Sequence, residues 1–93
     1  AVITASPAQI VDIVSDAADD GQSDRIVVQL DPPELGRVSI DFKFDANGLQ
    51  HVVITSETPE AMRQLRQMHF ELVQSLELHG IGSENMSFQH QHQ

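Results

Sequence analysis

The side chains best suited to metal chemistry are the histidines, which readily bind transition metals: His51, His69, His79, His90 and His92. His90 and His92 could share an ion in an extended segment, but no third ligand lies near them in the sequence. The histidine spacing matches no zinc signature, and the three aspartates between residues 19 and 24 do not form a calcium-binding EF-hand loop. We therefore predict no metal site. His69, on the apolar face of a predicted helix, is interpreted as a partly buried packing residue.

Residues for covalent or acid–base catalysis are sparse. The chain has no cysteine, so it has no thiol nucleophile, no disulfide and no cysteine-ligated zinc or iron–sulfur site. It also lacks a glycine-rich phosphate loop, the G-x-S-x-G motif of hydrolases, and any carboxylate pair that the sequence places in one pocket. We predict that the protein is not an enzyme and needs no cofactor.

The chain is strongly acidic. Five Lys and Arg stand against 14 Asp and Glu, which gives a net charge of -9. Nucleic-acid binding depends on basic side chains that neutralise phosphates, so nucleic acids and anionic lipids are poor partners. The apolar runs, such as residues 52–54, are far shorter than the roughly 20 residues of a membrane-spanning helix. We therefore predict no nucleic-acid binding and no membrane insertion.

The length of 93 residues fits one small domain. We place this domain at residues 6–88, between an N-terminal lead-in at 1–5 and a flexible polar tail at 89–93. The chain begins with alanine and has no signal-peptide pattern, which we interpret as a piece of a longer protein.

The elements that must position any site begin with two helices. Ser6 and Pro7 are typical of a helix start, and Gln9 completes a capping box with Ser6. This first helix ends near residue 20. Thr58 as N-cap and Pro59 at the first helical position start a second, longer helix, whose apolar stripe continues to about residue 78.

Strands are predicted between and after these helices. Residues 26–30 are apolar and β-branched, residues 38–44 alternate with all their apolar side chains inward, and turn residues at 45–48 lead into a strand at 51–55. Residues 86–88 alternate again. We expect an α+β fold: a short helix, a three-stranded antiparallel meander, a long helix and a short fourth strand. The fold is a two-layer sandwich, with both helices on one sheet face.

A rigid corner joins the first two strands. Pro32 and Pro33 fix two φ angles, and Pro33 pushes Pro32 towards extended geometry. Gly36 is expected to adopt a conformation closed to residues with a Cβ. Leu35 is thereby held in a defined place, either as a cap on one end of the core or as a partner contact.

The segment from Leu30 to Ile40, LDPPELGRVSI, resembles the signature of the C-terminal domain of bacterial flagellar hook-length control proteins. In that family a strand ends in L-x-P-x-x-L-G and a second strand follows directly. The later hairpin, apolar strand, leucine-patterned helix and Gly80-Ile81 also fit, so the resemblance covers residues 25–88. His69 departs from the pattern, which has an apolar residue there.

The resemblance implies a binding module of an exported molecular ruler. In such proteins the N-terminal part senses hook length, and the C-terminal domain contacts the cytoplasmic domain of the flagellar export-gate switch protein (FlhB type). Type III export then changes from hook-type to filament-type substrates. The implied location is the bacterial cytoplasm, followed by export through the flagellar type III pathway, and we expect a monomer.

Six residues in and after the corner are candidate partner contacts: Pro32, Pro33, Leu35, Gly36, Val38 and Ile40. Val38 and Ile40 are the first inward side chains of their strand, nearest the sheet end that two helices of unequal length cover least. The simpler interpretation is that both pack under the helices, because clean alternation indicates one covered face.

Two other functions stay open. A small sheet covered by helices is a common RNA platform, but that use needs exposed aromatic side chains and basic flanks. Here the strand phenylalanines share an inward face and the charge is acidic. The other alternative is a structural packing domain in a larger assembly.

Overall fold

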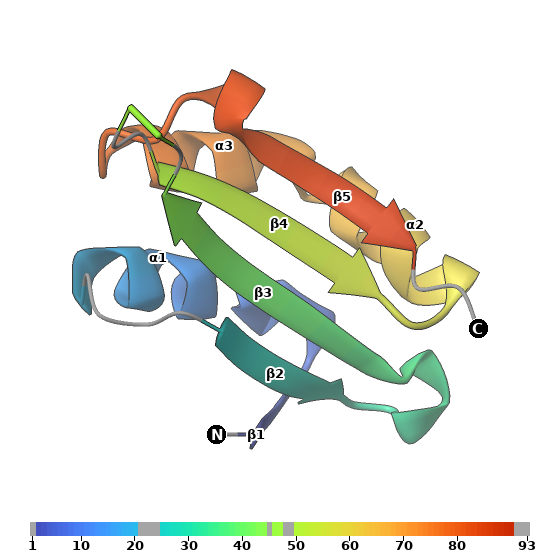
Figure 1. Cartoon of the computed structure of the whole chain (residues 1–93). Helices are drawn as coiled ribbons and strands as arrows, with labels where there is room; N and C mark the ends of the chain where they lie inside the picture. Colours follow the sequence, from blue (N-terminus) through green and yellow to red (C-terminus); the bar gives the residue numbers. More distant parts are fainter. Residues whose placement is uncertain (1, 21–24, 45, 48–49, 91–93) are drawn as a thin grey trace.

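The computed structural model describes residues 2–20, 25–44, 46–47 and 50–90, which form one sheet with helices on one of its faces (Figure 1). The strands lie side by side in chain order: β1 (Val2–Ala5), β2 (Arg25–Leu30), β3 (Arg37–Phe44), β4 (Gln50–Ser56) and β5 (Met86–His90). The helices are α1 (Ile10–Asp20), α2 (Pro59–Gln67) and α3 (His69–Glu77), with short 3-10 helices η1 (Pro7–Gln9), η2 (Pro33–Leu35) and η3 (Ser83–Asn85). The predicted turn residues Asp45 and Gly48, together with Asp24 and His92, lie outside the described residues.

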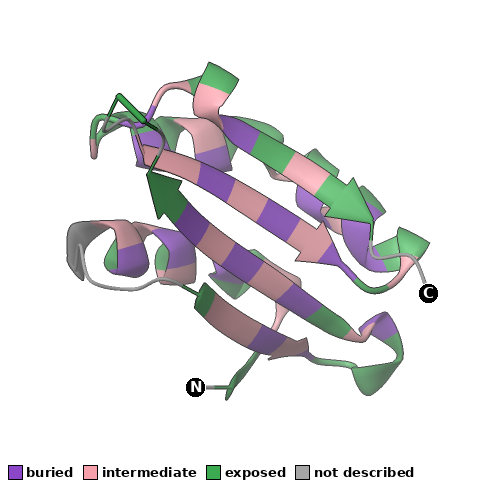
Figure 2. Ribbon diagram, viewed as in Figure 1, coloured by how far each residue is buried: buried purple, intermediate pink, exposed green. Residues whose placement is uncertain are grey.

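The predicted antiparallel meander is confirmed. β2 pairs with β3 and β3 with β4, both antiparallel, so that Val28 lies opposite Val38 and Ile40 opposite Ile54. Because side chains alternate along each strand, these pairs all fall on the face that the helices cover. Figure 2 shows the result as alternating buried and half-buried bands along β3 and β4.

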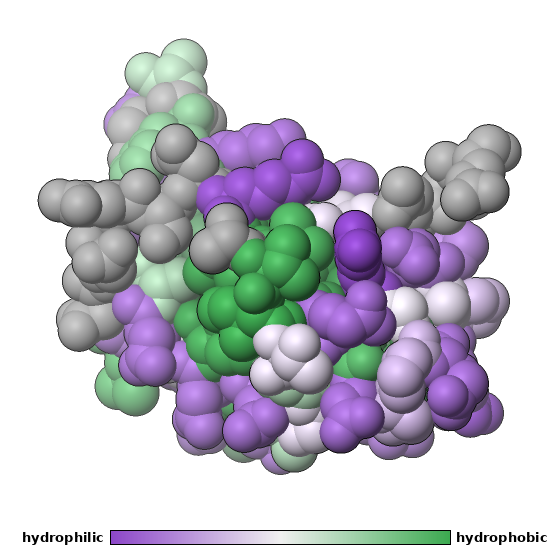
Figure 3. All heavy atoms as spheres, turned by 90° about the horizontal axis from the view of Figure 1, so that it is seen from below, coloured by the Kyte–Doolittle hydropathy of each residue, from purple (hydrophilic) through white to green (hydrophobic). Residues whose placement is uncertain are grey.

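The sheet has an additional strand at its N-terminal edge. β1 pairs in parallel with β2, with Ala5 beside Leu30, in the segment predicted to be a lead-in. Four residues without alternation are too short a pattern to predict a strand from the sequence. Only the pairing with β2 makes them a strand. Val2 and Ile3 stay 62% and 39% exposed. Figure 3, seen from below, shows apolar atoms gathered on the side of the molecule where β1 lies.

The opposite edge also differs from the prediction. β5 pairs in parallel with β4 and continues to His90, two residues beyond the predicted strand. Gln89 and His90, expected in the flexible tail, lie beside Thr55 and Ser56. The polar side chains of these residues do not prevent strand pairing, because the pairing is made by backbone hydrogen bonds. The observed sheet is therefore mixed and five-stranded, and the prediction of only four strands is wrong.

The predicted long helix is divided in two at Met68, where φ is -99° and ψ is 12°. The N–H of Met68 donates to the carbonyl of Leu65, three residues back, at 3.0 Å. No glycine or proline marks this position, which explains why the apolar pattern runs across it. His69 is exposed after the break, so the prediction of a partly buried histidine is wrong. Its ring centroid lies 5.9 Å from that of Phe88.

The first helix starts as predicted. The Ser6 N–H donates to the Gln9 side-chain oxygen at 2.9 Å, and η1 leads directly into α1. The core between helices and sheet is aliphatic, with its largest fully buried hydrophobic side chains at Ile10, Val14, Val28, Leu30, Val38, Ile40, Val52, Ile54, Leu65, Leu72 and Leu76. Phe44 is an exception to the predicted inward face. It is 66% exposed because it lies at the hairpin end of β3.

Replacing Ser56 by alanine should stabilise the protein. The Ser56 hydroxyl is fully buried and has no hydrogen-bond partner among the described residues, so folding removes it from water without compensation. The expected gain in the free energy of unfolding is about 1 kcal/mol, measured by urea denaturation. Ser87→Ala on the exposed part of β5 is the control and should change little. A marked loss of stability in Ser56→Ala would show that this hydroxyl is satisfied.

Candidate functional site at the proline corner

The corner, residues 31–36, is a closed loop between β2 and β3. The Asp31–Pro32 peptide is cis, and Pro32 has φ -72° and ψ 155°, the extended geometry that the sequence predicts. Within η2, Leu35 N–H donates to the Pro32 carbonyl at 3.1 Å and Gly36 N–H to the Pro33 carbonyl at 3.0 Å. The Leu30 N–H closes the loop by donating to the Gly36 carbonyl at 3.0 Å.

Gly36 adopts the predicted backbone conformation that is closed to residues with a Cβ, with a positive φ of 77° and a ψ of -153°. A second constraint acts on the same position. A Cβ on Gly36 would lie 3.0 Å from Oε1 of Glu57 and 3.3 Å from Cγ2 of Thr58. Both the backbone angle and the close approach of the β4–α2 connection therefore favour glycine.

The corner separates a buried residue from exposed ones. The Leu35 side chain is 6% exposed and belongs to the core, as the cap interpretation expects. Pro32, Pro33 and Glu34 are exposed, and Gly36 is half-buried. The loop thus presents two prolines and the carboxylates of Asp31 and Glu34 to solvent, on a base fixed by Leu35.

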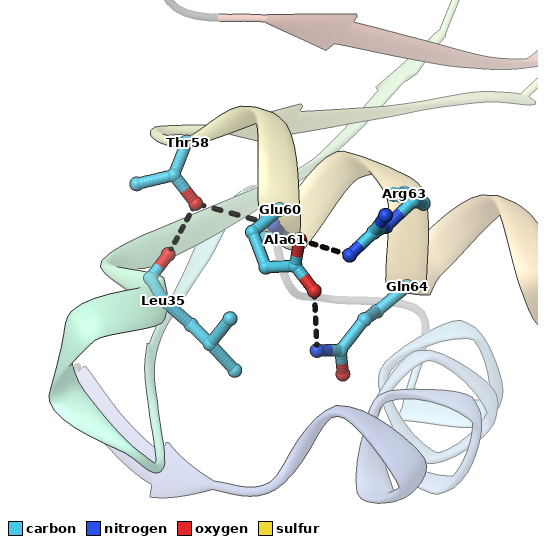
Figure 4. A network of polar contacts seen from close by, with 6 residues as sticks. All are labelled: Leu35, Thr58, Glu60, Ala61, Arg63 and Gln64. Atoms are coloured by element: carbon cyan, nitrogen blue, oxygen red, sulfur yellow. Dashed lines mark hydrogen bonds and ion pairs between the residues drawn. The ribbon is translucent and has the colours of Figure 1, made fainter.

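Thr58 attaches the corner to α2. Its hydroxyl donates to the Leu35 carbonyl at 2.8 Å and accepts from the Ala61 N–H at 3.1 Å (Figure 4). The sequence predicts the N-cap, but the bond to Leu35 arises between residues 23 positions apart and has no local signal. One side chain therefore sets the start of α2 and the position of the corner.

The first turn of α2 carries an exposed polar group beside Thr58 (Figure 4). Glu60 accepts hydrogen bonds from Arg63 and from Gln64, the latter at 3.4 Å. The bond from Arg63 is the larger cause that lowers the pKa of the Glu60 carboxyl from its ordinary value, and the same bond raises the pKa of Arg63. Both groups are exposed to solvent and stay charged near neutral pH.

Val38 and Ile40 are both fully buried, with no exposed surface. Val38 lies between Val28 and Ser56 in the sheet, and Ile40 lies opposite Ile54. This burial agrees with the simpler interpretation that both pack under the helices, and the expectation of an uncovered sheet end near the corner is wrong. Thr58, the N-cap of α2, is bonded to the Leu35 carbonyl and so places the start of α2 at that end. In this conformation the two side chains are core, and a partner at the corner would meet exposed groups.

Other chemistry has little basis in the described part of the chain. No group of three or more histidine, aspartate or glutamate side chains there could hold a metal ion. Nε2 of His79 lies 3.2 Å from the Ser15 hydroxyl oxygen. This contact links the segment after α3 to α1. Among the same residues, no helix has the length and apolarity to span a membrane.

These features define a small α/β module whose sheet is covered by helices on one face and which has a rigid, partly exposed corner. The chain belongs to the family of the flagellar hook-length control protein FliK, whose family model matches residues 14–93. The resemblance drawn from the corner signature is thereby confirmed. Membership places the chain among proteins of flagellar hook-length control.

A solved structure has the same fold. The chain is similar to the crystal structure of the PscP SS domain, with a TM-score of 0.57 and 24% sequence identity. The likeness covers 92% of this chain and 94% of the other. No curated protein matches the chain.

Thr58→Ala should reduce the free energy of unfolding by about 1–2 kcal/mol, because the helix loses its N-cap and the Leu35 carbonyl loses its donor. Thr58→Ser keeps the hydroxyl and should retain most of the stability. Urea denaturation of both variants tests this. Equal losses would show that the methyl group, not the hydroxyl, is the stabilising part.

Val38→Asp should abolish the cooperative thermal transition, because it places a carboxylate in the core without a partner. Val38→Ala should cost roughly 2–4 kcal/mol. Ser39→Asp is the matched control on the other face of β3, where the side chain is half-buried. It should melt nearly as the parent protein does. If Val38→Asp melted normally and lost only partner binding, the burial of Val38 would be contradicted.

Proposed function

We propose that the domain is a non-enzymatic binding module that contacts the cytoplasmic domain of the export-gate switch protein (FlhB type). By this contact it switches type III export from hook-type to filament-type substrates. The observation that carries the proposal is the family match over residues 14–93, which includes the corner and every helix and strand after α1. The domain acts within an exported protein and as a monomer.

The geometry of the corner supports a binding role. Its backbone is held by hydrogen bonds from Leu30, Leu35 and Gly36, and Thr58 attaches it to α2. A loop that is already ordered loses little conformational entropy when a partner binds, so more of the contact energy appears as affinity. We propose Pro32, Pro33 and the backbone of Gly36 as the direct contacts, with Leu35, Val38 and Ile40 supporting them from the core.

The two alternatives have less support. RNA platforms use exposed aromatic side chains on the sheet. Here Phe42 is 4% exposed under the helices, and Phe44 lies at the hairpin end. A purely structural packing role gives no reason for a rigid loop that carries exposed prolines.

Deleting residues 25–88 from the full-length protein should leave hook assembly intact but prevent its arrest at the normal length, because the switch contact is lost. Hook lengths and filament formation are measured by electron microscopy. Val38→Asp in the full-length protein should reproduce the deletion, since it unfolds the domain, whereas Ser87→Ala should behave as the parent protein. Hooks of normal length with filaments in the deletion strain would contradict the proposal.

A pull-down of the 93-residue chain against the export-gate cytoplasmic domain tests the contact itself. Specific capture is expected for the parent chain and for Ser87→Ala. Absence of capture in both would reject this partner.

A further inference from the structure

Helix α3 is apolar on two opposite sides. Its inward side contributes Leu72 and Leu76, which are 0% and 1% exposed. On the outward side, Phe70 is 68% exposed and Leu78, directly after the helix, is 86% exposed. Positions 70, 74 and 78 are spaced by one helical turn and therefore share a face. We call Phe70, Gln74, Glu77 and Leu78 the α3 outer stripe.

The surface is hollowed at the carboxyl end of this stripe. An open hollow of about 420 Å³ is lined by Gln74, Glu77 and Leu78. Single exposed apolar residues are common and need no explanation. Here two large apolar side chains share one helix face, and one of them borders a hollow.

The fold does not use these two side chains. Neither Phe70 nor Leu78 belongs to the core or packs against it. Their exposure therefore brings no stability to the free domain, whereas their burial by a partner would be favourable.

The charge around the stripe favours a basic partner. Glu77 lies on the stripe, Glu71 beside it, and the last turn of α3 has no basic residue. The carboxyl end of a helix carries partial negative charge, which adds to that of Glu77. Arg66, one turn before Phe70, is the cation at the other end of the stripe, and His79 is turned towards Ser15. The end near Leu78 is thus negative on a chain of net charge -9.

We propose that the α3 outer stripe docks an apolar segment that carries lysine or arginine. The apolar side chains of this segment cover Phe70 and Leu78, and its cation lies beside Glu77 and the carboxyl end of α3. The inference rests on the proposed function, because it assigns the segment to the cytoplasmic domain of the export-gate switch protein. Thr58 and Leu78 lie at opposite ends of the α2–α3 pair, so the corner and the stripe provide two separate contacts.

Binding of the purified export-gate cytoplasmic domain is measured by isothermal titration calorimetry. Phe70→Ser and Leu78→Ser should each weaken binding by about tenfold or more, as expected for buried apolar contacts at an interface. The matched control is Phe44→Ser, because Phe44 is 66% exposed but lies at the hairpin end of β3. It should bind as the parent chain does. Thermal melts of all three should match the parent, since none of these side chains packs in the core.

The charge is tested with Glu77→Lys and with Glu84→Lys, which makes the same charge change on η3. Glu77→Lys should weaken binding more than Glu84→Lys, and added salt should reduce the difference. Tighter binding by Glu77→Lys would overturn the basic partner. If the parent chain binds and both Phe70→Ser and Leu78→Ser bind with unchanged affinity, the proposed docking on the α3 outer stripe is wrong, and the proposed function is not affected. If the parent chain does not bind, the proposed function fails, and the assigned partner with it.

Discussion

The inner face of β3 must be kept from water, and most of the structure depends on that requirement. Val38 and Ile40 have no exposed surface, and Phe42 has 4%. β2 and β4 extend this apolar face on either side of β3, and the helices cover it. Because the chain has few aromatic residues and no disulfide, this close aliphatic packing is the main source of stability.

The corner joins the antiparallel strands β2 and β3 and also holds the start of α2. That start lies at the end of the sheet where β2 ends and β3 begins. Gly36 allows the turn, Leu35 fills the end of the core, and Thr58 bonds the corner to α2. The exposed prolines therefore lie on a part of the domain that is fixed by several hydrogen bonds, which suits the surface that we propose for recognition.

The residues that stabilise the fold are separate from the exposed features that we propose for recognition. Residues that determine the fold, such as Val38 and Leu72, are buried, whereas the exposed features lie on the corner and on α3. Phe70 and Leu78 contribute nothing to the core, and Pro33 is held in place by its neighbours. Substitutions on these surfaces can therefore test the proposed contacts without unfolding the domain.

Short-range physics made much of this protein predictable from its sequence. Alternation along residues 38–42 predicted the covered face of β3, Thr58 and Pro59 marked a helix start, and Gly36 marked a backbone closed to residues with a Cβ. Each signal acts within a few residues. The corner residues of the candidate site were found in the same way, from the types and order of the side chains.

What only the tertiary structure decided depends on distant partners. β1 is a strand because β2 lies beside it, and the tail residues Gln89 and His90 pair because β4 offers its backbone. The break at Met68 turns His69 out to solvent without any residue that marks it. The sequence left open whether Val38 and Ile40 are core residues or partner contacts, and their burial depends on where α2 begins in space. That position is set by a hydrogen bond across 23 residues, which no local pattern encodes.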